Sequence, residues 1–329
     1  QQPYYFLFKQ VTWVGLGVCL LLMAMRVDYR HLKKPLVVLT VLAGSVIALI
    51  AVLLIGPEIN GTRRWFAIGG IGVQPSELAK VAVILFTATV LEHRMNRIDE
   101  VSYSLLPIAV VTGGISALIV LEPDFGTAMT VLMIVGTMVF TAGLSYRYLF
   151  GLAVTLGPLL YVVLASAPYR RQRLLAFLDP WDDPLGSGFQ IIQSLIAVGT
   201  GGIFGQGLMA GVQKLFFLPE PHTDFIYAVI AEETGLLGAT FILLCFLMVV
   251  WRGLRVAVLA PDRFGSLLAL GLTMMVSIQA FLNISVVLGL MPTKGIPLPL
   301  VSAGGSSMLV SLLCMGVLLN ISQHASAEA

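Results

Sequence analysis

The segment FLPEPHTDFIYAVIAEETG at 217–235 places ionisable side chains where a polar loop runs into a long apolar stretch. Pro219 and Pro221 favour an extended approach, so Asp224 is predicted to stand at the boundary between water and an apolar helix. A partly desolvated carboxylate binds a proton more readily, which makes it a better general base. Asp224 is therefore a candidate catalytic base, although a plain helix N-cap uses the same residue type.

A second group of ionisable residues begins another apolar stretch. Glu77 follows Pro75 and Ser76, and Lys80 lies one helical turn further along. Ser76 is predicted to cap this helix, and Glu77 to favour the positive end of its dipole. The i,i+3 spacing also allows Glu77 and Lys80 to form an ion pair. A charge inside an apolar helix is costly unless it is paired or functional, so the pair has a structural and a functional interpretation.

Polar residues also interrupt two other apolar segments. Glu232 and Glu233 are predicted either to pair with another helix or to line an ion path. The segment MPTKGIPLPLVSAGGSS at 291–307 combines prolines and glycines with Lys294 and Ser302. Non-helical backbone at membrane depth is tolerated only where protein or water satisfies it. This segment is therefore predicted to re-enter the protein and line a cavity.

The composition indicates that these residues are positioned by membrane-spanning helices. The chain has 329 residues, of which 58% are hydrophobic and 11% are charged, whereas soluble domains carry about 25% charged residues. A spanning helix needs ~20 mostly apolar residues. We predict an all-α, polytopic transmembrane helical bundle that forms a single integral membrane domain over residues 1–329. About nine spans are predicted, at 4–25, 35–56, 76–92, 105–121, 127–145, 149–167, 225–252, 266–289 and 306–322.

The orientation follows from the basic residues in short loops, because Lys and Arg favour the cytoplasmic side. Alternate connections are rich in them, and these are predicted to be cytoplasmic: Arg26, Arg30, Lys33, Lys34, Arg94, Arg97, Arg147, Arg252, Arg255 and Arg263. The opposite short loops carry fewer basic residues and are predicted to lie outside. This topology places the C-terminus in the cytoplasm and Gln1 outside, so we expect an N-terminal helix to be missing from the sequence.

The connection at 168–224 is far longer than the ~2 to 8 residues of ordinary helix connections, and it is predicted to be a large extracytoplasmic loop. Short helices in or against the interface are predicted at 191–199 and 207–217. Arginines outside the membrane run against the tendency of basic residues to lie on the cytoplasmic side. The paired N–H groups of a guanidinium match phosphate oxygens. Snorkelling and salt bridges are the structural alternative. The candidate substrate-binding residues on this side are Arg63, Arg64, Arg171, Arg173, Lys214, His222, Lys294 and Ser302.

Several classes of function are excluded by what the sequence lacks. The net charge is +2 and the basic residues form no continuous stripe, so nucleic acid is not an expected partner. Phosphate-loop, dinucleotide-binding and HExxH motifs are absent, so no nucleotide or organic cofactor is expected. Cys19, Cys245 and Cys314 lie in separate apolar runs and are interpreted as core residues.

Six segments together resemble the SEDS family of bacterial cell-wall glycan polymerases, typified by FtsW and RodA, and are somewhat closer to FtsW. The resemblance covers nearly the whole chain. It departs from the family pattern at Ala303, where a tyrosine is usual, and in having nine predicted spans against ten in the family. The segments are NGTRRWF at 60–66, QPSELAK at 74–80, LEPDFGTA at 121–128, PYRRQRLLAFLDPWDDPLGSGFQIIQSLIAVGTGG at 168–202, FLPEPHTDFIYAVIAEE at 217–233 and PTKGIPLPLVSAGGSS at 292–307.

The resemblance implies a peptidoglycan glycosyltransferase in the bacterial cytoplasmic membrane, with its active site facing outside. Such an enzyme joins lipid II units for division or elongation and works with a class B penicillin-binding transpeptidase. The essential aspartate of the family falls on Asp224, and a second functional acid falls on Glu77. Trp65 and Lys80 lie in motif stretches that are also associated with activity and are expected to contact the substrate.

The predicted mechanism starts at Asp224. It acts as a general base, or holds a divalent cation such as Mg²⁺ or Mn²⁺, to activate the 4-hydroxyl of the acceptor for attack on the anomeric carbon of the donor. Outward arginines, Lys294 or a metal then stabilise the leaving pyrophosphate. Two alternatives remain: a lipid II flippase with a polar path through Glu77, Lys80 and the acidic pair at 232–233, and a non-catalytic scaffold for a transpeptidase.

Overall fold

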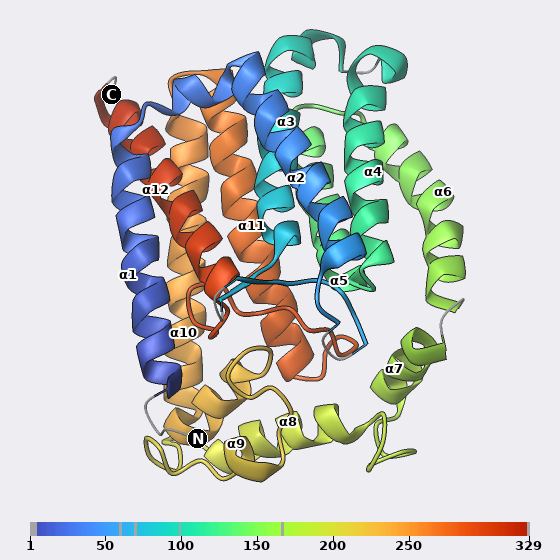
Figure 1. The fold of residues 1–329 in the computed structure, drawn as a ribbon, viewed down its shortest axis with the longest axis vertical. Helices are drawn as coiled ribbons and strands as arrows, with labels where there is room; N and C mark the ends of the chain where they lie inside the picture. Colours follow the sequence, from blue (N-terminus) through green and yellow to red (C-terminus); the bar gives the residue numbers. More distant parts are fainter. Residues whose placement is uncertain (1–4, 59–60, 69–70, 99, 166–167, 328–329) are drawn as a thin grey trace. The chain divides into compact units, whose positions relative to one another are not determined.

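The computed structural model describes residues 5–58, 61–68, 71–98, 100–165 and 168–327, and it is almost entirely helical (Figure 1). The chain forms two compact units, each described by itself below. The first comprises Gln1–Ser145, Val249–Ile278 and Ala303–Ala329. The second comprises Tyr146–Met248 and Gln279–Ser302. The chain therefore passes from one unit to the other within two of its helices, α10 (Ile226–Leu259) and α11 (Arg263–Val287).

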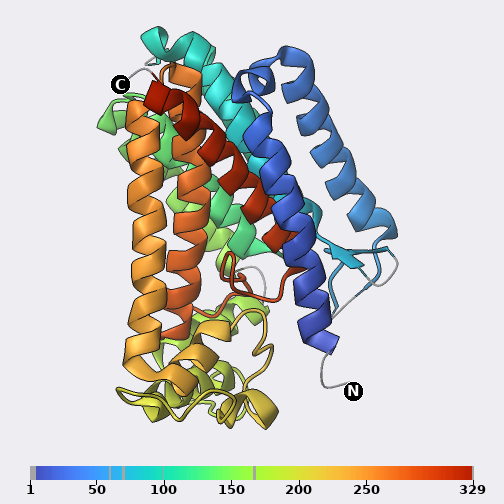
Figure 2. The same ribbon diagram turned by 90° about the vertical axis from the view of Figure 1, so that its left-hand side faces the viewer.

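The first unit is built from long helices and one small hairpin. Within it α1 packs against α12, α2 against α3, and α4 against α5 (Figures 1 and 2). The strands β1 and β2 pair antiparallel between α2 and α3. Besides parts of α10 and α11, its elements are α1 (Tyr5–Arg26), η1 (Tyr29–Lys33), α2 (Pro35–Ile55), β1 (Phe66–Ile68), β2 (Ile71–Val73), α3 (Pro75–Arg94), η2 (Met95–Arg97), the π turn η3 (Val101–Leu105), α4 (Leu106–Leu121), α5 (Phe125–Thr141) and α12 (Gly305–Ala327).

The second unit contains α6 (Tyr146–Ala165), α7 (Pro168–Leu178), α8 (Phe189–Gly201) and α9 (Gln213–Phe216), with the remaining parts of α10 and α11. The helix predicted at 191–199 is confirmed as part of α8. The prediction of a helix at 207–217 is wrong for its first half, because only α9 is helical there. Gly207 and Met209 have φ values of 107° and 66°, and this left-handed backbone cannot continue an α-helix.

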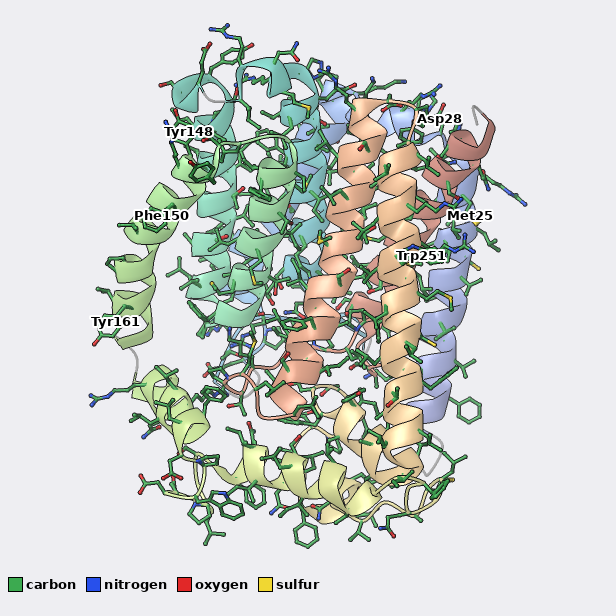
Figure 3. The ribbon with its side chains drawn as sticks, turned by 180° about the vertical axis from the view of Figure 1, so that it is seen from behind. Met25, Asp28, Tyr148, Phe150, Tyr161 and Trp251 are labelled. Atoms are coloured by element: carbon green, nitrogen blue, oxygen red, sulfur yellow. The ribbon has the colours of Figure 1, made fainter. Side chains whose placement is uncertain are left out.

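Each of the nine predicted spans corresponds to a helix in the described residues, with boundaries that differ by up to seven residues. The span predicted at 225–252 is interrupted at Gly235, and residues 4 and 166–167 of two others lie outside the described residues. Among the described residues, six helices are long and apolar enough to cross a membrane. Of the other predicted spans, α5 has only 17 residues, and α3 carries Glu77, Lys80 and Glu92. Tyr148, Phe150 and Tyr161 on α6 (Figure 3) are between 40% and 72% exposed, as expected for side chains that face lipid. The chain is a polytopic helical membrane protein.

Contacts within the first unit join its basic loops at one end. Lys33 forms an ion pair with Glu92 at 2.9 Å, and the Arg263 guanidinium donates a hydrogen bond to Asn96 at 3.1 Å. The turn before α11 also meets η1, where Tyr29 donates a hydrogen bond to the Asp262 carboxylate. The predicted placement of these three connections on one side of the membrane is therefore consistent with the structure of this unit.

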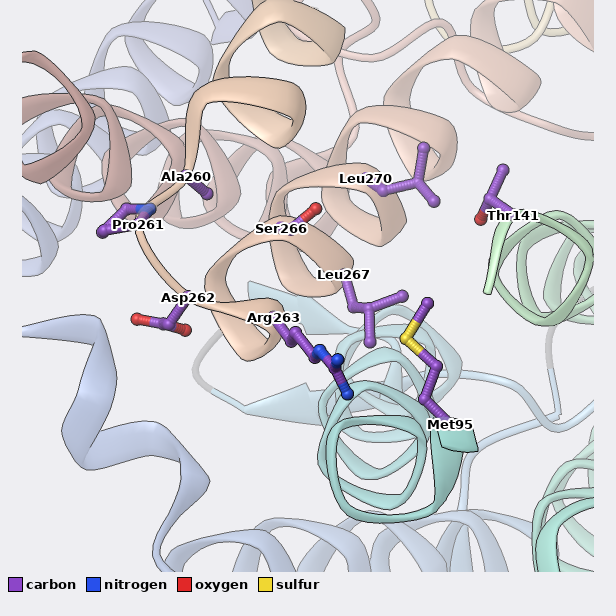
Figure 4. Close-up of a pocket in the computed structure, with 9 residues that line it drawn as sticks. All are labelled: Met95, Thr141, Ala260, Pro261, Asp262, Arg263, Ser266, Leu267 and Leu270. Atoms are coloured by element: carbon purple, nitrogen blue, oxygen red, sulfur yellow. The ribbon is translucent and has the colours of Figure 1, made fainter. Parts of the chain in front are cut away.

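The same end of the first unit contains a cavity of about 330 Å³ (Figure 4). Its lining combines Met95 and Thr141 with side chains from the α10–α11 turn and the start of α11, including Arg263 and Leu267. None of the candidate site residues lines this cavity. It is therefore separate from the chemistry that the sequence predicts.

Close approach between α1 and α12 depends on glycine. A methyl group added to Gly316 would lie 2.6 Å from the backbone oxygen of Leu21 and 2.9 Å from the Ala24 side chain. Helices in lipid associate largely through such tight backbone packing, because lipid supplies no hydrophobic drive between them. Gly316 is thus required by packing rather than by turn geometry.

We expect Gly316→Ala to lower the Tm of the detergent-solubilised protein by several degrees, because α12 must move away from α1. The matched control is Gly15→Ala on α1, where an added methyl group meets nothing within 4 Å. This control is expected to leave Tm unchanged or slightly raised, since alanine favours helix. Equal Tm values for the two variants, measured by thermal unfolding, would contradict the assigned packing.

Candidate active site

Asp224 lies in the second unit, in the turn that precedes α10, and its side chain is half-buried. Two side chains hold the backbone of this turn. The Asn283 amide donates to the carbonyl oxygens of Asp224 and Ile296, each at 2.7 Å. Ser302 donates its hydroxyl to the carbonyl of Thr223 at 2.5 Å. The turn that carries Asp224 is therefore fastened to the 291–302 segment.

The Asp224 carboxylate itself faces this segment at Gly295. A methyl group added to Gly295 would lie 2.8 Å from Oδ2 of Asp224, so only glycine leaves the carboxylate in place. Lys294 is the preceding residue, and it brings a basic side chain to the same turn. A half-buried carboxylate with a fixed backbone is suited to accept a proton from a substrate hydroxyl.

Sequence reasoning identified Lys294 and Ser302 in this segment but missed Asn283 and Gly295. Asn283 gave a usable signal, because a buried amide within an apolar helix needs a specific partner. It is 2% exposed. Gly295 gave no such signal in the sequence, because the chain contains many glycines and only the tertiary contact distinguishes this one. The structure thus adds two positioning residues to the predicted set.

Lys214 and the acidic pair of α10 form a structural clamp in the second unit. The Lys214 ammonium donates to the Glu233 carboxylate, and both side chains are less than one-fifth exposed. Glu232 accepts the backbone N–H groups of Val212 and Gln213 at 2.8 and 3.2 Å. Glu233 therefore pairs with Lys214 of the short helix α9, which agrees with the prediction of a structural partner on another helix. The N–H groups that Glu232 accepts lie at the start of the same helix.

The remaining predicted residues of this unit differ in their exposure. Arg171 and Arg173 lie on the exposed surface of α7. His222 is half-buried two residues before Asp224. The structure therefore brings residues His222, Asp224, Lys294 and Ser302 to the region of the turn that precedes α10.

Glu77 and Lys80 form the predicted ion pair in the first unit. Their charged atoms lie 2.7 Å apart, and the side chains are 2% and 1% exposed. The prediction that Ser76 caps α3 is wrong: Gln74 occupies the N-cap position and makes no side-chain cap. Pro75 already supplies a helix start that needs no N–H partner. Oε2 of Glu77 has no hydrogen-bond partner among the described residues, so this buried pair retains capacity for one more donor.

The basic residues at 63 and 64 have different roles in the first unit. The Arg64 guanidinium donates to the backbone oxygens of Glu122 and Pro123, at 2.7 and 2.5 Å. It therefore ties the hairpin region to the α4–α5 turn. The Arg63 side chain is 47% exposed and reaches Glu58 at 4.0 Å. Trp65 is partly buried, and its ring covers Gly72 of β2.

The α4–α5 turn also contains an acid that sequence reasoning did not select. Glu122 is 0% exposed, and neither carboxylate oxygen has a hydrogen-bond partner among the described residues. Asp124 is satisfied by the backbone N–H and hydroxyl of Thr127, at 3.0 and 2.7 Å. Burial raises the pKa of Glu122 to about 8, the Asp124 charge adds to the rise, and Arg64 opposes it. Glu122 is therefore mostly protonated at neutral pH.

A family model supports the resemblance across the chain. The FtsW/RodA/SpoVE model, described as a cell cycle protein, matches residues 1–327. The chain belongs to this family. The predicted family and fold class are thereby confirmed.

Members of the FtsW/RodA/SpoVE family with similar sequences come from several bacteria. The probable peptidoglycan glycosyltransferase FtsW of Geobacter metallireducens is 44% identical, over 97% of this chain and 85% of that protein. Stage V sporulation protein E of Bacillus subtilis is 41% identical, over 98% of this chain and 88% of that protein. The chain therefore aligns with most of the length of both relatives.

Solved structures in the family have the same fold. A chain of a peptidoglycan synthase complex that coordinates polymerization and crosslinking superposes with a TM-score of 0.83 and 34% identity, covering 98% of this chain and 91% of that one. The rod shape determining protein RodA of Thermus thermophilus superposes with a TM-score of 0.72 and 30% identity, covering 98% and 89%.

A divalent cation at Asp224 would have few protein ligands. The described part of the chain brings no three His, Cys, Asp or Glu side chains together at a metal-binding distance. Mg²⁺ is often held by one or two carboxylates together with substrate phosphates and water. The residues of this family member therefore fit a cation shared with a phosphate-bearing substrate, and they do not fit a metal centre built from protein ligands alone.

We expect Glu122→Gln to change how stability depends on pH. The Glu122 pKa rises from an ordinary 4.5 to about 8 on folding, so the folded state retains a proton that the unfolded state loses. The stability that protonated Glu122 contributes to the parent protein is therefore lost progressively as pH rises from about 4.5 to 8. The glutamine cannot ionise and escapes this loss. Thermal unfolding at pH 5 and pH 8 should show the variant gaining Tm relative to the parent only at the higher pH.

Glu58→Gln is the matched control, because the Glu58 side chain is 62% exposed. It should follow the parent protein at both pH values. An equal difference in Tm between Glu122→Gln and the parent at pH 5 and pH 8 would show that Glu122 does not titrate in this window.

Proposed function

We propose that this chain is a peptidoglycan glycosyltransferase that polymerises lipid II into glycan strands. The observation that carries the proposal is the half-buried Asp224 carboxylate, held against the 291–302 segment by Asn283 and Ser302. Relatives that align over nearly the whole chain are named probable peptidoglycan glycosyltransferases. A fixed carboxylate in a partly water-exposed turn supplies the proton acceptor that this reaction class requires.

The proposed step is one displacement at the anomeric carbon of the donor. The 4-hydroxyl oxygen of the acceptor GlcNAc forms the new bond to that carbon, and its proton passes to the Asp224 carboxylate. The bond from the anomeric carbon to the donor phosphate breaks, and its electron pair leaves with undecaprenyl pyrophosphate. Lys294 beside Gly295 is placed to stabilise the negative charge that develops on this leaving group. In the alternative to proton acceptance, Asp224 would hold a divalent cation such as Mg²⁺ or Mn²⁺, which would supply activation of the hydroxyl and charge neutralisation when bound.

The proposed location is the bacterial cytoplasmic membrane, with the active site outside and the C-terminus in the cytoplasm. Clustering of basic loops at one end of the first unit supports this orientation, because Lys33 and Arg263 both have partners there. Asp224 belongs to the segment predicted to be a large extracytoplasmic loop, so lipid-linked substrate would reach it from outside.

A class B penicillin-binding transpeptidase is the proposed partner. A similar solved chain belongs to a peptidoglycan synthase complex for polymerization and crosslinking. A polymerase makes linear strands, and crosslinking requires a second activity, so a shared complex places the two reactions on the same growing strand. The relatives named FtsW support a division role over an elongation role.

We expect Asp224→Asn to reduce polymerisation of labelled lipid II by the purified protein by about 10²- to 10⁴-fold, the usual contribution of a general base. The amide keeps the shape of the side chain but cannot accept the proton. Glycan products are measured by gel electrophoresis, with and without a cognate transpeptidase. Asp182→Asn, at an exposed position of the same unit, is the matched control and should retain parent activity.

Other outcomes distinguish the alternative functions. Parent-level polymer from folded Asp224→Asn would refute the assigned base. Transfer of lipid II across sealed vesicles without polymer would favour a flippase, and neither activity would favour a scaffold.

We expect Asn283→Leu to lower the turnover rate by about 10-fold or more with little change in KM, because the Asp224 backbone loses its fastening and small misplacements of catalytic groups are costly. The matched control is Gln279→Leu, which alters another buried amide one helical turn earlier on α11. It should retain activity within about twofold, as expected for a group away from the reacting atoms. Equal losses in both variants, with the same Tm, would argue against a specific positioning role for Asn283.

A further inference from the structure

The segment from Gly202 to Phe217, between α8 and α10, displays an unusual density of exposed apolar side chains. They are between 43% and 86% exposed. Large apolar side chains facing water are unfavourable, and a contiguous set of them marks a surface that is covered by something else. The side chains are Ile203, Phe204, Leu208, Met209, Val212, Leu215 and Phe217.

Backbone hydrogen bonds determine the position along α10 at which this segment is attached. Gly202 and Ile203 accept the backbone N–H groups of Leu236 and Leu237, at 2.9 and 3.3 Å. At this level α10 has a non-helical residue, Gly235, with φ 68° and ψ −165°. Figures 1 and 2 show the segment in yellow and gold against the end of α10 that begins at Ile226. The apolar loop is thus attached at the kink and not at the first turn of the helix.

The kink coincides with the place where α10 starts to face lipid. The helix has 34 residues, about 51 Å at 1.5 Å per residue, whereas the hydrocarbon core is about 30 Å thick. The run from Leu236 to Trp251 contains no charged residue, and Leu236, Leu237 and Phe241 are between 58% and 65% exposed. The part of α10 before Gly235 therefore extends beyond the hydrocarbon core, and the boundary of the core lies near the kink.

The loop is held firmly in this position. Glu233 accepts the Met209 backbone N–H at 3.0 Å and also binds Lys214, while Glu232 accepts two further N–H groups. Gly207 donates its N–H to the carbonyl of Glu233 at 3.0 Å. Polar groups of the segment are consequently bonded to α10, while its large apolar side chains remain exposed.

We propose that residues 202–217 form a membrane anchor that inserts its apolar side chains into the interfacial layer of the bilayer beside α10. The occupant of this surface is lipid, because the loop is bonded to α10 at Leu236 and Leu237, where the exposed apolar run of that helix begins. Interfacial segments bind by burying such side chains at the boundary of headgroups and acyl chains. The anchor leads directly into the turn that carries Asp224, so it fixes the height of this carboxylate relative to the membrane surface. This inference does not depend on the proposed enzymatic activity.

Site-directed spin labelling of the full chain in lipid nanodiscs tests the anchor. The native cysteines at 19, 245 and 314 are replaced by alanine, and single cysteines are introduced in the variants Phe204→Cys, Leu208→Cys and Met209→Cys. Collision rates of each label with oxygen, which partitions into lipid, and with a water-soluble nickel complex are compared. The matched control is Asp182→Cys, on an exposed loop of the same unit.

The expected result is a ratio of oxygen to nickel collisions that favours oxygen at the three loop positions and nickel at the control. Nickel-dominated collisions at all three loop positions would overturn the proposal. So would labels that become protected only after a transpeptidase is added, because the surface would then belong to a protein partner. As a second measurement, Phe204→Trp in a protein whose native tryptophans at 13, 65, 181 and 251 are replaced by phenylalanine should show fluorescence that brominated lipids quench and unbrominated lipids do not. Absence of that quenching in a folded protein would also overturn it.

Discussion

Buried polar groups in this protein must be satisfied by the protein itself, because the hydrocarbon around the spans offers no hydrogen bonds. This constraint explains most of the specific contacts in the structure. Lys80 is paired with Glu77 inside the first unit, and Asn320 accepts the Tyr29 N–H while donating to Met25. The Glu77–Lys80 pair satisfies charges within α3, whereas Asn320 joins α12 to the end of α1 and to η1, segments that apolar packing alone would leave free to slide. Directional polar contacts therefore define the register that nonspecific apolar burial does not.

The same constraint shapes the candidate active site. The Asn283 amide donates hydrogen bonds to two backbone carbonyls, one of which belongs to Asp224. The Ser302 hydroxyl donates to the carbonyl of the adjoining residue, Thr223. The backbone is thus satisfied by buried side chains, while the Asp224 carboxylate is left half-buried at the surface of its turn. A catalytic group benefits from this division, because its position is rigid although its reactive atoms can reach a substrate. Glycine at 295 completes the arrangement by leaving room for the carboxylate.

Acidic residues that look alike in the sequence have different roles, because their surroundings in the fold provide different hydrogen-bond partners. Glu232 and Glu233 are enclosed and hold a loop through backbone N–H groups and Lys214. Glu122 is enclosed without a hydrogen-bond partner among the described residues, and its raised pKa keeps it mostly protonated at neutral pH. Asp224 alone among these four stands in a turn fastened to the 291–302 segment. Environment, rather than residue type, separates these structural acids from Asp224, the candidate catalytic base.

The sequence by itself determined the helical membrane architecture, because runs of ~20 apolar residues have few other stable forms in lipid. It also determined the family, and it indicated Asp224 through the boundary between a polar loop and an apolar helix. Only the tertiary structure decided the irregular path at 202–212, since its left-handed residues and its bonds to α10 have no local periodicity. It likewise decided that Arg64 supports the α4–α5 turn and that Asn283 positions Asp224. These contacts join residues 58 or 59 positions apart, and no pattern within a single segment encodes them.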